Sequence, residues 1–138
     1  MRRLILGPLA GVMMAGAAWA QGVLEPEPAI RDTIQSQLDA FMADDFGAAF
    51  EFAAPNIRQM FRTPETFGAM VQQGYPMVWR PGAVEYGDLR EIEGLLWQRV
   101  LVTDKTGRQF VLEYQMQDVL GDWRIAGVRV VPAPSVSA

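Results

Sequence analysis

Tyrosine and carboxylate side chains are the groups in this sequence that could do chemistry without a cofactor. A carboxylate base that faces a tyrosine hydroxyl in a dry cavity can remove a proton next to a carbonyl group, while the hydroxyl stabilises the developing oxyanion. Tyr114 is the candidate donor, because Leu112 and Met116 share its face of a predicted strand. Asp88 is the candidate base, since its strand parity allows it to point inward or to pair with Arg90.

A structural role competes with this catalytic interpretation. A tyrosine in such a position is more often packed in the core, with its hydroxyl satisfied at the rim. The other nearby acids fit less well, because Glu113 has the opposite strand parity and Asp118 lies at a turn. No acidic residue points clearly at Tyr114, so the pattern favours a domain that is not an enzyme.

The composition removes most other catalytic chemistry. The 138 residues include no cysteine and no histidine, which excludes disulfides, thiol nucleophiles, Ser-His-Asp triads and imidazole or thiolate metal sites. We therefore expect no cofactor and no metal. Asp44 and Asp45 are adjacent, but such a pair between helices is typical of a helix end and a helix cap, and calcium requires six or more oxygens. Lys105, the only lysine, lies in a turn where nothing would desolvate it.

The charge balance argues against a nucleic-acid partner. Sixteen acidic residues outnumber twelve basic ones, whereas binding to a phosphate backbone needs clustered lysine and arginine. Arg99 lies in mid-strand between Trp97 and Leu101 on one strand face. It could clamp an anionic ligand or stack on an aromatic ring, but an ion pair with a neighbouring strand or subunit is the simpler interpretation.

Aromatic and methionine side chains could line a pocket for a small apolar ligand. Methionine adapts to irregular ligands, although residues of these types form an ordinary core more often than a binding site. We expect an open pocket near the junction between the helical half and the strand half of the chain. The candidate lining residues are Tyr75, Met77, Trp79, Trp97, Tyr114 and Met116.

The first twenty residues have the pattern of a secretory leader. Met1-Arg2-Arg3 precedes the apolar run from Leu4 to Trp19, and Ala18-Trp19-Ala20 is a small-residue cleavage motif. The interrupted apolar run is shorter than the roughly 20 residues that span a bilayer, so an uncleaved anchor is the weaker alternative. We expect cleavage after Ala20, a periplasmic or secreted protein, and no membrane span afterwards. Ten basic and sixteen acidic residues would remain, for a net charge of −6.

The first half of the chain reads as helical. Residues 21–27 predict an extended lead-in, because closely spaced prolines cannot lie inside a helix. Apolar residues at spacings of three and four then predict a helix from Pro28 to about residue 44. Its buried stripe would consist of Ile30, Ile34, Leu38, Phe41 and Met42. Asp45 is expected to cap a second short helix, and Thr63-Pro64-Glu65 to begin another that ends at Gly74.

The second half predicts four antiparallel strands, near residues 83–92, 95–103, 108–117 and 123–131. In the third strand, Phe110 joins the apolar face of Tyr114. The turns are expected at Glu93-Gly94, at 104–107, and at Gly121-Asp122 as a type II′ turn. A bulge at Ala126-Gly127 would place four apolar side chains on the core side. These are Trp123, Ile125, Val128 and Val130. The second strand is apolar on both faces, which suggests a second subunit on one side, and residues 133–138 predict a flexible tail.

The order of helices and strands resembles the nuclear transport factor 2-like superfamily, also called cystatin-like. Over roughly residues 28–132, the chain is similar to a bacterial family of exported single-domain proteins of unknown function. The segments that carry the resemblance are Ile57-Arg58-Gln59-Met60-Phe61, Thr63-Pro64-Glu65, Gly74-Tyr75-Pro76 and Trp123-Arg124-Ile125. The resemblance implies an α+β cone in which N-terminal helices pack on a curved four-stranded antiparallel sheet. It also implies an apolar pocket in many members and homodimers formed through the outer sheet face.

Two functions follow as expectations. The first is a non-enzymatic exported module that binds a partner protein or a small apolar ligand. The alternative is a cofactor-free isomerase or lyase similar to the ketosteroid isomerases of that superfamily, with Asp88 as base and Tyr114 as donor. Fold alone does not choose between them.

Overall fold

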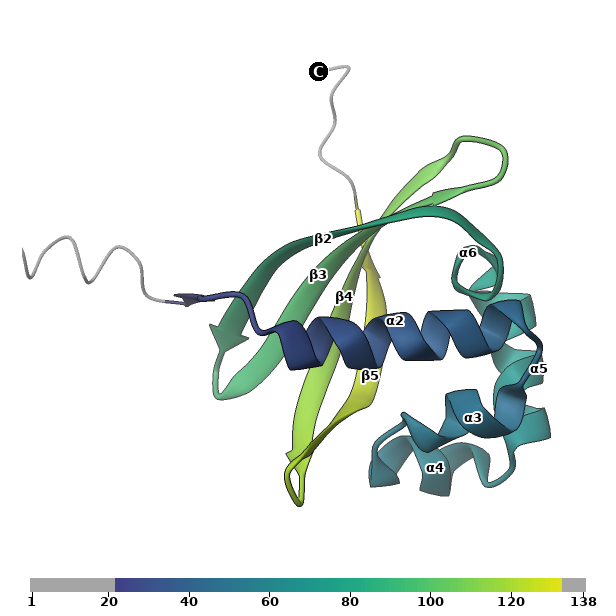
Figure 1. Cartoon of the computed structure of the whole chain (residues 1–138), viewed down its shortest axis with the longest axis horizontal. Coiled ribbons are helices and arrows are strands. Elements are labelled where there is room, and N and C mark those ends of the chain that lie inside the picture. Colours follow the sequence, from purple (N-terminus) through teal and green to yellow (C-terminus); the bar gives the residue numbers. More distant parts are fainter. Residues whose placement is uncertain (1–21, 133–138) are drawn as a thin grey trace, which may run out of the picture.

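Proline residues begin four of the five helices described (Figure 1). These helices are α2 (Pro28–Met42), α4 (Pro55–Phe61), α5 (Pro64–Gly74) and α6 (Pro76–Trp79), and α3 (Phe46–Glu51) follows the cap Asp45. Proline suits the first helical position because the amide that it lacks would have no partner there. The computed structural model describes residues 22–132, so the expected leader and the expected tail lie outside the described residues.

The expected helix caps are confirmed. The Asp45 carboxylate accepts a hydrogen bond from the Ala48 amide at 3.1 Å, and the Thr63 hydroxyl accepts one from the Thr66 amide at 3.1 Å. The long first helix ends at Met42, and the single turn of α6 was not expected. The prediction that Met42 belongs to the buried stripe is wrong: Met42 is the last residue of α2, and its side chain is 43% exposed.

The sheet has five antiparallel strands in sequential order, one more than predicted. The strands are β1 (Val23–Leu24), β2 (Pro81–Ile92), β3 (Leu95–Asp104), β4 (Gln109–Val119) and β5 (Asp122–Val131). The four predicted strands are confirmed within a few residues. The extra strand β1 lies in the expected lead-in, where Val23 pairs with Arg90 at the edge of β2. The prolines that follow exclude a helix but leave this edge pairing possible.

Two hairpins close through two-residue turns in which both residues have positive φ. Glu93 and Gly94 have φ values of 52° and 83°, and Leu120 and Gly121 have 54° and 92°. This is the type I′ pattern, so the predicted type II′ turn at Gly121-Asp122 is wrong. Strand β4 runs further than expected and pairs with β5 as far as Val119, so the turn lies one residue earlier than predicted. The Asp118 carboxylate accepts a hydrogen bond from the Gly121 amide at 2.8 Å within this turn.

The sheet curves around α2, and the core lies between them (Figure 1). We call the side of the sheet that faces α2 the inner face and the opposite side the outer face. Leu112, Tyr114 and Met116 are buried on the inner face, with Phe110 packed against the same cluster, as the alternation predicts. Each such side chain contributes about 2 kcal/mol through burial of apolar surface.

The predicted bulge in β5 is confirmed. Gln115 pairs with Gly127 and Met116 pairs with Ile125, so Ala126 is the extra residue. Trp123, Ile125 and Val128 pack against the core. Val130 pairs with Leu112 and so lies on the predicted side of the sheet, but its side chain is 47% exposed. Because β5 is the last strand of the sheet, no further strand covers its end.

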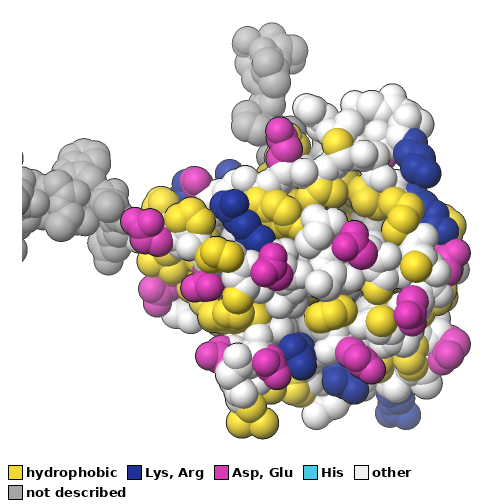
Figure 2. Space-filling model, in the orientation of Figure 1, with side chains coloured by type: hydrophobic (Ala, Val, Ile, Leu, Met, Phe, Trp, Pro, Cys, Tyr) yellow, Lys and Arg dark blue, Asp and Glu magenta, His cyan; other side chains and the backbone are white. Residues whose placement is uncertain are grey.

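The surface is chemically mixed. Acidic and basic side chains are interspersed on the face shown in Figure 2, with apolar side chains between them. Within residues 22–132, no helix combines the length and the apolar character needed to cross a bilayer. The same part of the chain has no cluster of three or more acidic side chains suited to a metal ion. Asp44 instead accepts hydrogen bonds from Trp79 and Arg80, and Asp45 is the cap of α3.

Candidate functional site

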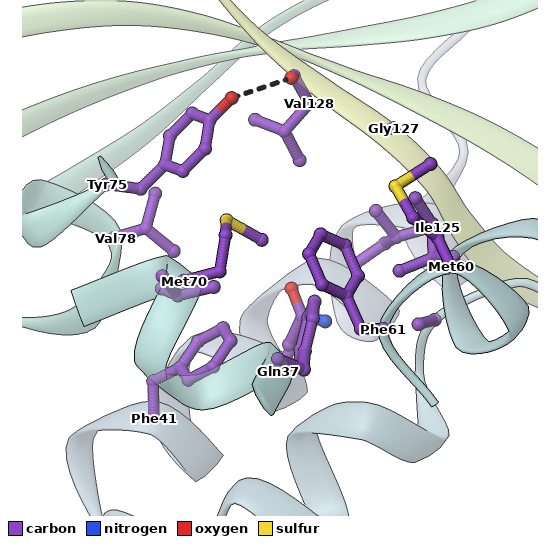
Figure 3. A pocket seen from close by; sticks show the side chains of 14 residues that line it. Gln37, Phe41, Met60, Phe61, Met70, Tyr75, Val78, Ile125, Gly127 and Val128 are labelled. Atoms are coloured by element: carbon purple, nitrogen blue, oxygen red, sulfur yellow. Dashed lines mark hydrogen bonds between the residues drawn. The ribbon is translucent and has the colours of Figure 1, made fainter. Parts of the chain in front are cut away.

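An apolar pocket of about 220 Å³ opens between the helices and β5 (Figure 3). Its walls come from α2, α4, α5, α6 and the bulged part of β5. Aliphatic, aromatic and methionine side chains form nearly all of its surface. The lining residues are Gln37, Phe41, Ala53, Ile57, Met60, Phe61, Phe67, Met70, Val71, Tyr75, Val78, Ile125, Gly127 and Val128.

The bulge in β5 shapes one wall of the pocket. Ile125 and Val128 are three positions apart, so a regular strand would place them on opposite faces of the sheet. The extra residue, Ala126, restores both side chains to the pocket side, and the backbone of Gly127 lies between them. The Ala126 carbonyl accepts a hydrogen bond from the Asn56 side chain at 3.0 Å, which ties the start of α4 to the bulge.

Phenylalanine rings form the helical side of the pocket. The Phe67 ring lies 5.7 Å from Phe41, 5.3 Å from Phe50 and 5.8 Å from Phe61, measured between ring centroids. Offset, tilted ring pairs at these separations are favourable. Gly68 on α5 permits the close approach of Phe46, because a Cβ atom there would lie 2.7 Å from that ring. The packed phenylalanine rings therefore form the helical wall of the pocket.

Two polar side chains reach this apolar lining. Gln37 on α2 is only 3% exposed, and its amide nitrogen donates to the Ala49 carbonyl at 3.0 Å. The Tyr75 hydroxyl donates to the Val128 carbonyl over a long 3.4 Å. Figure 3 shows these two groups on opposite sides of the pocket. An apolar pocket with a few polar groups that fix orientation is the usual form of a small-molecule site.

Helix α4 forms the outer wall of the pocket. It contributes Ile57, Met60 and Phe61 to the lining, although none of its residues is fully buried. Met60 is 66% exposed while it also lines the pocket. A residue with both properties marks the mouth, and methionine is suited to that position because its flexible thioether adapts to different contacts.

The structure places one of the expected pocket residues, Tyr75, in the lining of this pocket. Met77 and Met116 are buried in the core, and the Trp79 indole donates to Asp44 at 2.9 Å. Trp97 lies on the outer face. These residues are therefore spread over the core, the helix junction and the far side of the sheet.

The two expected catalytic residues are not brought together. The Tyr114 side chain is fully buried, its hydroxyl has no hydrogen-bond partner within residues 22–132, and burial raises the pKa of this hydroxyl well above the ordinary value. Asp88 lies at an irregular part of β2, where its exposed carboxylate pairs with Arg90 at 3.4 Å. Among the described residues, no carboxylate lies within hydrogen-bond distance of the Tyr114 hydroxyl.

A second buried polar group, Glu113, lies on the outer face of the sheet. Its carboxylate accepts hydrogen bonds from Arg99 at 2.7 Å and from Arg129 at 2.8 Å. The Arg129 guanidinium also lies 4.0 Å from the centre of the Trp97 ring. Burial tends to raise the pKa of Glu113, but the hydrogen bonds and charges of the two arginines outweigh it and hold the pKa below its usual 4.5. Arg99 thus forms the expected ion pair with a neighbouring strand.

Gln37 was not predicted as a lining residue, although its position in the sequence carries a signal. Gln37 follows Ile34 by three positions and precedes Phe41 by four, so it falls on the apolar stripe of α2. A polar residue on such a stripe is buried with the rest of the stripe and must find partners there. The contribution of α4 did have a signal, because Ile57, Met60 and Phe61 follow the i, i+3, i+4 spacing of one helical face, which predicts a turn of helix there.

The comparisons with known proteins assign no function to the chain, as expected from the sequence. A family model described as Domain of unknown function (DUF4864) matches residues 24–138. The match therefore includes the pocket and both faces of the sheet. No curated protein and no solved structure matches the chain. The chain belongs to the DUF4864 family of domains of unknown function.

Proposed function

We propose that this domain is a binding module for a small apolar molecule, which it holds in the pocket between the helices and β5. The observation that carries the proposal is the hollow of about 220 Å³ with an almost wholly apolar lining. A cavity of roughly 150 Å³ with such a lining is enough to bind benzene. The expected ligand is therefore a substituted single ring or a short alkyl chain, and its binding is driven by removal of apolar surface from water.

Titration with p-xylene, followed by NMR chemical shifts and by the melting temperature, tests this proposal. We expect saturable shifts at residues that line the pocket, and a higher melting temperature because the ligand binds the folded state. Met60→Glu should weaken binding severalfold, since a carboxylate at the mouth would lose water when the ligand enters. Met42→Glu is the matched control, because Met42 is also an exposed methionine on a helix but does not line the pocket. Absence of saturable binding would refute the proposal.

We also infer that the domain has the nuclear transport factor 2-like fold. The support is a strongly curved antiparallel sheet that wraps a long first helix and leaves a hollow beside it. A crystal structure of the protein tests this inference by superposition on established members. A sheet that is flat, or that is not wrapped around α2, would contradict it.

A homodimer through the outer face is a further part of the proposal. Across β3, β4 and β5 the partners Leu101, Val111 and Val131 form an apolar row on that face. Beside it, Glu113 is already neutralised by its two arginines, so covering the face buries no lone negative charge. Sedimentation velocity should show a dimer that Leu101→Glu weakens and that Leu120→Glu, in an exposed turn, leaves unchanged. A strict monomer would remove the dimer from the proposal.

Export and leader removal are proposed from the sequence of the first twenty residues. The charged start, the short apolar run and the motif before Gln21 support cleavage after Ala20. Mass spectrometry of the protein purified from its native cells should give an N-terminus at Gln21. Intact Met1 in the bulk of the protein would contradict this part.

The alternative function, a cofactor-free isomerase or lyase, has less support. It requires a carboxylate beside the Tyr114 hydroxyl, and the described lining of the pocket contains no acidic residue. Isomerisation of a β,γ-unsaturated ketone that is lost in Tyr114→Phe would restore this alternative.

A further inference from the structure

Among the described lining residues of the pocket, Gln37 is the one that is both polar and almost completely buried. It projects from α2 among apolar neighbours and is 3% exposed. Its amide carries two different groups, a nitrogen that only donates hydrogen bonds and an oxygen that only accepts them. The arrangement of its partners therefore decides which group is left for a ligand.

The orientation of the Gln37 amide follows from its partner in α3. The Ala49 carbonyl is an acceptor, so the amide nitrogen must face it, and the distance between the two atoms is 3.0 Å. The amide oxygen then has to point the other way. Figure 3 shows this oxygen on the pocket side of Gln37. No residue in 22–132 donates a hydrogen bond to this oxygen, and it is not among the fully enclosed side-chain atoms without a partner, so a molecule in the hollow can reach it.

An amide oxygen that faces a mostly apolar hollow and has no donor from the described residues can accept a hydrogen bond from a ligand that enters the hollow. We propose that the ligand of this pocket is an apolar molecule with one neutral hydroxyl group, such as an alkylphenol or an alkyl alcohol, and that the hydroxyl donates to the Gln37 amide oxygen. This inference rests on the proposed function and names its ligand class.

The other lining residues favour a neutral ligand whose hydroxyl group lies at Gln37. No charged side chain lines the pocket among the described residues, so a carboxylate or an ammonium group would be buried without a counter-charge. The Tyr75 hydroxyl is already directed to the Val128 carbonyl on the opposite side. The polar end of the ligand is thus expected at Gln37 and its apolar body along Phe61, Met70 and Ile125.

A matched pair of probes tests the inference. 4-Ethylphenol and 4-ethyltoluene have the same shape and differ by a hydroxyl group in place of a methyl group. Their dissociation constants are measured by NMR titration on the full chain and on Gln37→Leu, which removes the acceptor at similar volume. The preference for the phenol, expressed as the ratio of the two constants, should fall about tenfold in the variant, as expected for loss of one net hydrogen bond.

Affinity for 4-ethyltoluene is the internal control for an intact pocket, and Gln37→Met replaces the leucine variant if that variant does not fold. A preference that stays the same in the variant would overturn the hydroxyl assignment, and so would binding of the hydrocarbon alone. Either result would leave the proposed apolar site in place. If neither probe binds the wild type, both the inference and the proposed function fail. The same unchanged preference is expected if a water molecule alone occupies the amide oxygen.

Discussion

Gln37 and Glu113 are both buried polar residues, but they lie on opposite sides of the sheet. They also differ in how many of their polar atoms have a hydrogen-bond partner. The Glu113 carboxylate, on the outer face, has both oxygens occupied by arginine groups at 2.7–2.8 Å. The Gln37 amide, in the pocket, has its nitrogen occupied and its oxygen without a donor from the described residues. The two sites are almost equally buried, at 5% and 3% exposure. The two sites therefore differ in the number of polar atoms left without a partner and are alike in burial.

This difference in free polar atoms is what we expect between a residue that stabilises the fold, Glu113, and one that can contact a ligand, Gln37. A buried charge with all its hydrogen bonds made stabilises the fold and has nothing left to offer a ligand. A buried amide with one free acceptor beside a hollow contributes less to stability and can recognise a donor. The comparison predicts that the two sites respond differently to substitution.

Glu113→Ala is expected to give the largest effect. The substitution removes the carboxylate that accepts hydrogen bonds from Arg99 and Arg129. Because these arginines are 41% and 53% exposed and can be solvated afterwards, the expected cost is about 2 kcal/mol, as for loss of hydrogen bonds to a charged group. Urea unfolding with an unchanged m-value measures the loss. Glu91→Ala is the matched control, because Glu91 is an exposed glutamate on the same sheet, and it should cost less than about 0.5 kcal/mol. Equal effects at both positions would show that the cluster is not structural.

Lowering the pH should remove the contribution of Glu113 to the free energy of unfolding. The pKa of Glu113 is lower in the folded state than its usual 4.5, so its ionised form stabilises the fold. The contribution is complete above pH 4.5 and is lost as the pH falls through the folded-state value. Unfolding free energies between pH 3 and pH 6 should fall less steeply in Glu113→Gln than in the wild type. An identical pH dependence in both proteins would contradict the assignment.

Gln37→Leu is expected to cost only about 1 kcal/mol, because it removes one neutral hydrogen bond. The Ala49 carbonyl keeps the bond from the Phe52 amide at 3.2 Å, so it is not left without a partner. Gln59→Leu, at an exposed position on α4, is the control and should be nearly neutral. A loss in Gln37→Leu as large as that of Glu113→Ala would assign Gln37 a structural role and weaken the contrast between the two faces.

Tyr114→Phe should give the smallest effect and the opposite sign. Its hydroxyl is buried and has no partner in the part of the chain that the structure describes, so removal of the hydroxyl should stabilise the fold by up to about 1 kcal/mol. Tyr86→Phe is the matched comparison, because the Tyr86 hydroxyl donates to Gln35 at 2.8 Å, and this change should destabilise by about 1 kcal/mol. A clear loss of stability in Tyr114→Phe would indicate that a buried water satisfies the hydroxyl.

Local patterns in the sequence predicted much of the fold. The prolines and caps located the helices, and the alternation around Tyr114 identified the inner face of β4. The change of parity between Ile125 and Val128 predicted the bulge. The edge strand β1 escaped prediction, because two residues are too few to show a period and their pairing with β2 depends on contacts that are distant in sequence.

The candidate site was less predictable than the fold. The lining of the pocket comes from five elements, and only Tyr75 among the expected lining residues belongs to it. Trp79 and Trp97 were expected in the lining because they fall near the junction between the helices and the sheet. The indole of Trp79 instead donates to Asp44, and strand parity places Trp97 on the outer face. The hollow depends on how α4 and α5 pack beside the bulge, which no local pattern encodes.

The sequence by itself determined the absence of cysteine and histidine chemistry, the division into a helical half and a strand half, and the faces that are buried. These properties follow from residue types and from periods of 3.6 and 2, which act over a few neighbouring residues. Only the tertiary structure decided that, among residues 22–132, the Gln37 amide oxygen has no donor while both Glu113 oxygens have one, and that a hollow lies beside Gln37. Such outcomes depend on the partners that distant segments bring to a buried group, and burial in itself does not specify those partners.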